Sequence, residues 1–128
     1  MAGCHPSHEA EIEQGVAVAN KWLEFVDAGK YDEAMAISDR EIMAGFGGRR
    51  RFIRDFFEIK TMFGKRLSRS LKDKAYEKDP KDASPGEYVR IDYDSSWKLA
   101  PKATEFMLIK KQDDDSWKVH LYVIRPHY

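Results

Sequence analysis

The chain has 128 residues, about the length of one domain, which is enough to bury one hydrophobic core. Hydrophobic residues make up 42% of the chain and charged residues 34%, with 5 prolines, a composition that excludes disordered and fibrous proteins. The 22 basic and 22 acidic side chains cancel, which argues against nucleic acid or an anionic membrane as a partner of the chain as a whole.

Residues 1–8 predict a flexible N-terminal tail. Within it, Ala2-Gly3-Cys4 resembles the end of a bacterial lipobox, in which the cysteine is lipidated after removal of a signal peptide. Two interpretations stay open. Either Cys4 is the lipidation site of a periplasmic or envelope lipoprotein that lacks its signal peptide here, or a tail of a cytoplasmic protein happens to contain a cysteine. A single cysteine excludes an internal disulfide and a multi-cysteine zinc site, and we expect no metal and no cofactor.

The N-terminal half reads as helical. Apolar residues recur at spacings of three and four from Ile12 to Val26, which is typical of an amphipathic helix. Ser7 is the expected N-cap of this helix, and Gly29 is its expected end. Residues 31–37 predict a short second helix.

Two further helical signals follow. Residues 38–41 have the capping-box pattern that opens another turn. From about Arg50 to Phe63, phenylalanine and isoleucine recur at helical spacing, and Gly64 is the expected stop.

After Gly64 the apolar residues alternate, which predicts strands over residues 66–72, 88–94, 102–111 and 116–125. The last two form an antiparallel hairpin through the turn at residues 112–115. Helices followed by strands predict one α+β domain over residues 9–128, with N-terminal helices packed on a curved antiparallel sheet. In the last strand the alternation places one set of residues in the core, Trp117, Val119, Leu121 and Val123. The other set is then expected to face away, Lys118, His120, Tyr122 and Ile124.

Sequence blocks in this order and spacing resemble a known bacterial family. They are residues 22–31, 63–69 and 85–89, then Glu105, then residues 117–122. Together they are similar to domain-of-unknown-function family 4019, placed in the nuclear transport factor 2-like (cystatin-like) superfamily, and the resemblance covers about residues 17–125. It implies a cone-shaped fold, in which a curved sheet surrounds helices and a cavity.

The resemblance does not decide the function, because this superfamily contains enzymes as well as binding and dimerisation modules. The sequence also departs from the family pattern. Met35 stands where the family tends to have tryptophan, and Leu121 where it tends to have glycine. Leucine fits the expected core-facing position, and would fill a pocket that a glycine-dependent bend had shaped there.

Arg69 is the main candidate for a functional residue. It lies between Leu67 and Leu71 on the apolar face of its strand, where an unpaired charge is costly. Glu105 alternates in phase with apolar residues, so we predict an Arg69 to Glu105 ion pair inside the cone or at its mouth. Such a pair either fixes the register of the strands or takes part in ligand binding. Tyr93 and Trp97 are further candidate ligand-binding residues.

His120, Tyr122 and Ile124 are candidate interface residues, because the alternation places them on the outer face of the sheet. The sequence has no nucleophile elbow and no histidine-rich metal spacing. Asp92 and Asp94 share a strand face but are expected to be solvated. No catalytic residue is assigned.

Two functions remain. The first is an exported or envelope-associated, non-enzymatic domain, expected to form a homodimer, that binds a small molecule or a protein partner in or around its cone. The alternative is a small isomerase, hydratase or cyclase that uses Glu105 in an internal pocket. It is the less favoured function, because Arg69 and Glu105 are expected to neutralise each other.

The zero net charge hides an uneven distribution. Residues 1–48 contain three basic and nine acidic side chains, whereas residues 49–78 contain eleven basic and four acidic ones. We expect acidic side chains of the first half to neutralise Arg49, Arg50 and Arg51, with anion binding by this basic segment as the alternative.

Overall fold

The computed structural model describes residues 7–127, where helices precede an antiparallel sheet, as predicted. The helices are α1 (Glu9–Asp27), α2 (Tyr31–Ala36), α3 (Arg40–Phe46) and α4 (Arg49–Phe63). The strands are β1 (Arg66–Lys78), β2 (Glu87–Trp97), β3 (Ala100–Lys111) and β4 (Trp117–Pro126). None of the helices in this part of the chain has the length and apolar character needed to cross a membrane. Cys4 and His5 lie outside the described residues.

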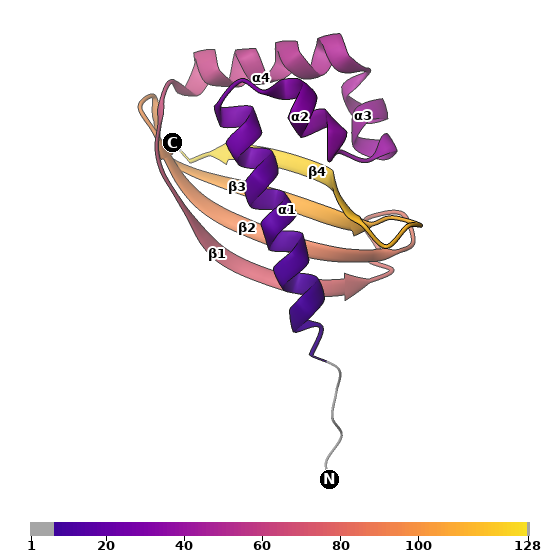
Figure 1. Ribbon diagram of the computed structural model, residues 1–128. Coiled ribbons are helices and arrows are strands. Elements are labelled where there is room, and N and C mark those ends of the chain that lie inside the picture. Colours follow the sequence, from indigo (N-terminus) through magenta and orange to yellow (C-terminus); the bar gives the residue numbers. More distant parts are fainter. Residues whose placement is uncertain (1–6, 128) are drawn as a thin grey trace.

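The sheet is a meander in the order β1-β2-β3-β4, and each neighbouring pair is antiparallel. It curves strongly, and α1 runs obliquely across its concave face (Figure 1). Helices α2, α3 and α4 gather beside the C-terminal end of α1, on the same side of the sheet (Figure 1). The concave face and the helices therefore enclose the core, and the opposite face of the sheet points outward.

Close packing between α1 and β2 depends on a glycine. A Cβ atom added to Gly15 would lie 2.6 Å from the Cβ of Val89, so only glycine allows this approach. Further along α1, the fully buried Trp22 donates a 2.9 Å hydrogen bond from its indole nitrogen to the hydroxyl of Ser38. These contacts hold α1 against neighbouring elements at two points along its length.

The helix ends differ in part from the prediction. Ser7 is not the N-cap of α1; His8 holds that position with a φ of 52°, and its side chain makes no capping hydrogen bond. The turn expected after residue 38 is α3, which Asp39 caps by accepting a 2.8 Å hydrogen bond from the backbone nitrogen of Ile42.

The predicted alternation of β4 is wrong beyond Val119. Leu108 pairs with Leu121 and the next residue of β3, Ile109, pairs with Val119, so β4 bulges at His120. A bulge reverses the face on which later residues lie. Leu121 is therefore 37% exposed instead of buried.

The residues after the bulge are reversed as well. Tyr122 packs on the main core and Ile124 on a smaller cluster around Phe63, although both were expected to face outward. Val123 was expected in the core and instead lines a shallow groove with Asp92 and Phe106. The assignment of Tyr122 and Ile124 to an interface thereby loses its basis.

Candidate ligand-binding site

Arg69 and Glu105 form the predicted ion pair. The Nε of Arg69 lies 2.7 Å from one oxygen of Glu105, and an Nη lies 2.8 Å from the other. The Glu105 side chain is 0% exposed and that of Arg69 is 11% exposed. The pair is thus bidentate and almost fully removed from water, which confirms the predicted contact.

Asp27 is a third member of this network, which sequence reasoning missed. It ends α1 and accepts hydrogen bonds of 2.8 Å from Arg69 and 3.1 Å from Arg66. A bulge in β1 at Leu67 turns both arginines toward α1, and leaves Leu67 62% exposed. One signal was available, because Asp27 follows Leu23 by four residues and so shares the apolar face of the helix.

Tyr122 completes the hydrogen bonding of Glu105. Its hydroxyl donates to Glu105 at 2.6 Å, while its ring packs against Trp22 and Phe56 at centroid distances of 5.1 and 5.7 Å. Burial raises the pKa of the Tyr122 hydroxyl well above its ordinary value, and the negative charge of Glu105 raises it further. Tyr122 therefore stays neutral and acts as a hydrogen-bond donor.

Arg69 likewise stays protonated. Burial lowers the pKa of Arg69, but the hydrogen bonds and charges of Glu105 and Asp27 outweigh it, so that the pKa is raised overall. Both oxygens of Glu105 are consequently occupied by permanent donors.

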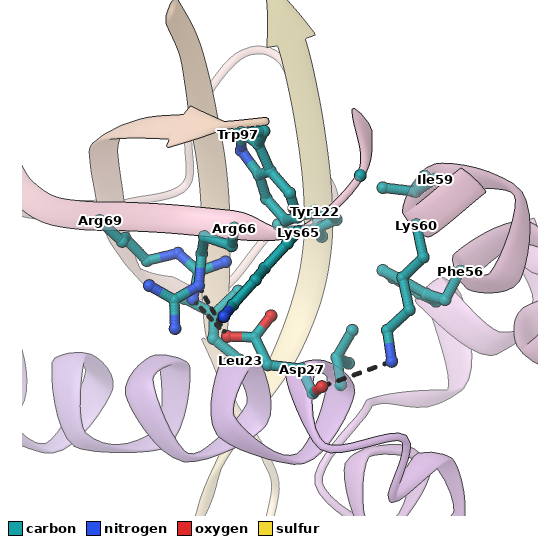
Figure 2. Close-up of a pocket in the computed structure, with 12 residues that line it drawn as sticks. Leu23, Asp27, Phe56, Ile59, Lys60, Lys65, Arg66, Arg69, Trp97 and Tyr122 are labelled. Atoms are coloured by element: carbon teal, nitrogen blue, oxygen red, sulfur yellow. Dashed lines mark hydrogen bonds and ion pairs between the residues drawn. The ribbon is translucent and has the colours of Figure 1, made fainter. Parts of the chain in front are cut away.

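Beside this network lies a cavity of about 460 Å³, which we call the main cavity. It opens between the C-terminal end of α1, helix α4 and the start of β1 (Figure 2). Its apolar walls come from Leu23, Val26, Phe56, Ile59, Trp97 and Tyr122. Its polar wall comes from Asp27, Lys60, Lys65, Arg66 and Arg69. A volume in this range and a mostly apolar lining with a few polar groups are typical of small-molecule sites.

The four candidate ligand-binding residues differ in their relation to the main cavity. Arg69 and Trp97 line it, whereas Glu105 lies behind Arg69 and does not. Tyr93 is buried against α1, where its hydroxyl donates a 2.7 Å hydrogen bond to Asn20. Burial raises the pKa of Tyr93 to about 12; the Arg69 charge opposes this rise and the Glu105 charge adds to it.

A second polar cluster lies at the edge of the sheet, where Asp39, Glu41 and His120 could together hold a metal ion. The Nδ1 of His120 lies 2.7 Å from Oδ2 of Asp39, within hydrogen-bond distance, and the Nε2 of His120 lies 3.8 Å from Glu41. Glu41 is already paired with Lys110 at 2.8 Å and accepts hydrogen bonds from Ser84. The cluster therefore connects α3 and the loop before β2 to the sheet, with the carboxylate of Glu41 neutralised.

The basic segment is neutralised in part by the first half of the chain, as expected. Arg49 makes two hydrogen bonds to Asp32, at 2.7 and 3.0 Å, and both arginines of the main cavity contact Asp27. Within residues 7–127, Arg50 and Arg51 have no ion pair within 4.0 Å.

A four-stranded curved antiparallel sheet that wraps around helices and leaves a cavity at one end defines a nuclear transport factor 2-like fold. Within this class, the chain belongs to the family described as "Protein of unknown function (DUF4019)", whose model matches residues 18–122. The resemblance found in the sequence is thereby confirmed. No curated protein matches the chain.

Solved structures share the fold at low sequence identity. A ketosteroid isomerase-like protein from Erwinia carotovora atroseptica is 12% identical, with a TM-score of 0.61 over 94% of this chain and 98% of that one. A protein from Catenulispora acidiphila is 10% identical, with a TM-score of 0.63 over 95% of each chain. ActVI-ORFA from Streptomyces coelicolor is 8% identical, with a TM-score of 0.58 over 93% and 96%. At these identities the comparisons establish the fold alone.

Proposed function

We propose that the chain is a non-enzymatic binding domain that takes a small, largely apolar molecule into the main cavity. The observation that carries this proposal is the cavity itself, about 460 Å³ in volume and walled by six apolar or aromatic side chains beside a fixed ionic network. Such a combination of apolar walls and preorganised polar groups supports selective binding.

The environment of Glu105 favours binding over catalysis by this residue. A general base needs a free lone pair that can reach the substrate. Both oxygens of Glu105 accept hydrogen bonds from Arg69, one of them also from Tyr122, and the residue is 0% exposed. Asp27 does line the cavity; Arg66 and Arg69 both donate to its Oδ2, while its Oδ1 accepts no hydrogen bond from the described residues. An enzymatic role for Glu105, the alternative from the sequence, would first require the release of Arg69.

Fluorescence of the neutral dye N-phenylnaphthylamine, which increases in apolar surroundings, tests this proposal. Ile59→Trp, which adds volume to the cavity wall, is expected to weaken dye binding by about tenfold or more. Phe57→Trp is the matched control on the same helix, because Phe57 is 67% exposed and does not line the cavity. Absence of dye binding to the unmodified chain, or equal binding by both variants, contradicts the proposal.

Export and lipidation at Cys4 are part of the same proposal and rest on the lipobox-like Ala2-Gly3-Cys4 alone. Mass spectrometry of the protein isolated from its own host is the test. A diacylated Cys4 in the membrane fraction supports it, and an unmodified Cys4 in the soluble fraction contradicts it.

Homodimer formation through the outer face of the sheet is also proposed. After the correction for the β4 bulge, Phe106 and Val123 are apolar residues of this face, and the 37% exposed Leu121 lies at its edge, beside α3. Asp92 and Arg125 line the groove beside them, so a second copy related by a two-fold axis could pair opposite charges across the contact.

A further inference from the structure

We infer that the ligand of the main cavity is an amphipathic anion, with an apolar body and a single negatively charged group. This inference rests on the proposed function and adds the chemical class of the ligand. It follows from the charges that remain at the cavity after its internal ion pairs are formed.

The ion pairs account for two of the four cations of the cavity wall. Arg69 is matched by the buried Glu105, and Arg66 by Asp27. No described carboxylate lies within 4.0 Å of the ammonium groups of Lys60 and Lys65. The cavity therefore has two more positive than negative charges.

The two lysines are well placed to meet a ligand. Lys60 extends from the last turn of α4 and Lys65 from the residue before β1, and both side chains point toward the end of α1 (Figure 2). Lys60 donates only a long hydrogen bond of 3.4 Å, to the backbone oxygen of Asp27, and lies 5.6 Å from the ring centroid of Tyr31. Both ammonium groups can thus turn to an anion without breaking a buried ion pair.

The apolar walls of the main cavity indicate that the uncharged part of the ligand is apolar. Phe56, Ile59 and Trp97 lie on the same cavity as the lysines, so a fully hydrophilic anion such as inorganic phosphate would leave their surface without a partner. A molecule that places a ring system or a short acyl chain on this wall and its charged group near the lysines satisfies both parts. Asp27 limits the charge, because a second negative group would approach its carboxylate.

Two dyes with the same rings provide the test: anilinonaphthalene sulfonate, which carries one negative charge, and neutral N-phenylnaphthylamine. We expect the sulfonate to bind about tenfold more tightly at low salt, and this preference to shrink at about 0.5 M salt. The double variant Lys60→Gln, Lys65→Gln is expected to lose most of the preference. Lys72→Gln, which removes an exposed charge of β1 outside the cavity, is the matched control and should keep it.

The preference is the ratio of the two dye affinities within each variant, so a change in cavity shape that affects both dyes cancels. Equal affinities for the two dyes in the unmodified chain overturn the inference. So does an equal loss of preference in the control and in the double variant, because the effect would then come from net charge. If neither dye binds, the proposed function itself fails, which is a distinct result.

Discussion

Replacing Arg69 with methionine tests whether the ion pair is as deeply buried as the structure shows. The change removes hydrogen bonds of 2.7 and 2.8 Å to Glu105 and one of 2.8 Å to Asp27. It leaves the fully buried Glu105 with only the hydroxyl of Tyr122. Removing one partner of a buried pair costs about 3 to 5 kcal/mol. In a domain of this size the melting temperature is then expected to fall by roughly 10 to 20 °C.

Two variants separate burial from charge alone. Arg66→Met is the matched control, because Arg66 contacts the same Asp27 but its side chain is 34% exposed. We expect it to cost about 1 kcal/mol or less. Adding Glu105→Gln to Arg69→Met removes the stranded charge and keeps an acceptor for Tyr122, so it should recover about 2 kcal/mol.

Urea unfolding followed by circular dichroism measures these free energies. A deficit within 1 kcal/mol at pH 7, or no recovery in the double variant, would refute the reasoning.

Other substitutions test the packing and the outer face. Gly15→Ala is expected to destabilise the fold by about 1 to 3 kcal/mol, because its Cβ would lie 2.6 Å from Val89 of β2. Gly45→Ala, on a helix with open space around it, should stabilise the fold by up to about 1 kcal/mol. Thermal unfolding of the two variants compares these effects. Tyr122→Phe should cost about 1.5 to 3 kcal/mol at pH 7 by the loss of its hydrogen bond to a carboxylate. Because the pKa of Tyr122 is raised in the folded chain, the stability that its hydroxyl contributes is lost as the pH rises above about 10. The difference in unfolding free energy between Tyr122→Phe and the unmodified chain is therefore expected to shrink there, which urea unfolding from pH 8 to 11 measures. Leu121→Arg is expected to convert a dimer into a monomer in sedimentation velocity, and an unchanged mass contradicts pairing through this face.

The order of elements could be predicted from the sequence because hydrophobic periodicity reports directly on burial. The change from helical spacing to alternation at Gly64 marks the end of α4, one residue beyond its last helical residue. The strand from residue 66 was predicted to end at 72 and continues to Lys78, since its second half is largely exposed and carries little apolar signal. Exposed edge strands are the elements that such patterns describe least well.

The faces of the strands were less predictable, because alternation assumes that no residue is inserted. β4 contains an extra residue at His120, and its apolar composition on both sides of that position gave no sign of the change. A run that is hydrophobic at nearly every position is compatible with either face. The contact between Arg69 and Glu105 could be predicted for the opposite reason: two charges in otherwise apolar strands need each other.

Two of the bulges in the sheet bring the site together. In β1 the extra residue Leu67 allows Arg66 and Arg69 to face α1 together, so that both reach Asp27. In β4 the extra residue His120 turns Tyr122 inward, where it supplies the last donor to Glu105. Regular strands would have placed one arginine and the tyrosine on the outer face.

This arrangement also corrects the expected effect of Leu121. Leucine at this position was expected to fill a pocket inside the cone, but after the bulge it is 37% exposed and lines a separate pocket beside α3 instead of the main cavity. The residue that lines the cavity there is Tyr122, whose hydroxyl is already hydrogen-bonded to Glu105. The buried ionic network thus supports the wall of the cavity, while the unpaired lysines at its opening remain available to select what enters.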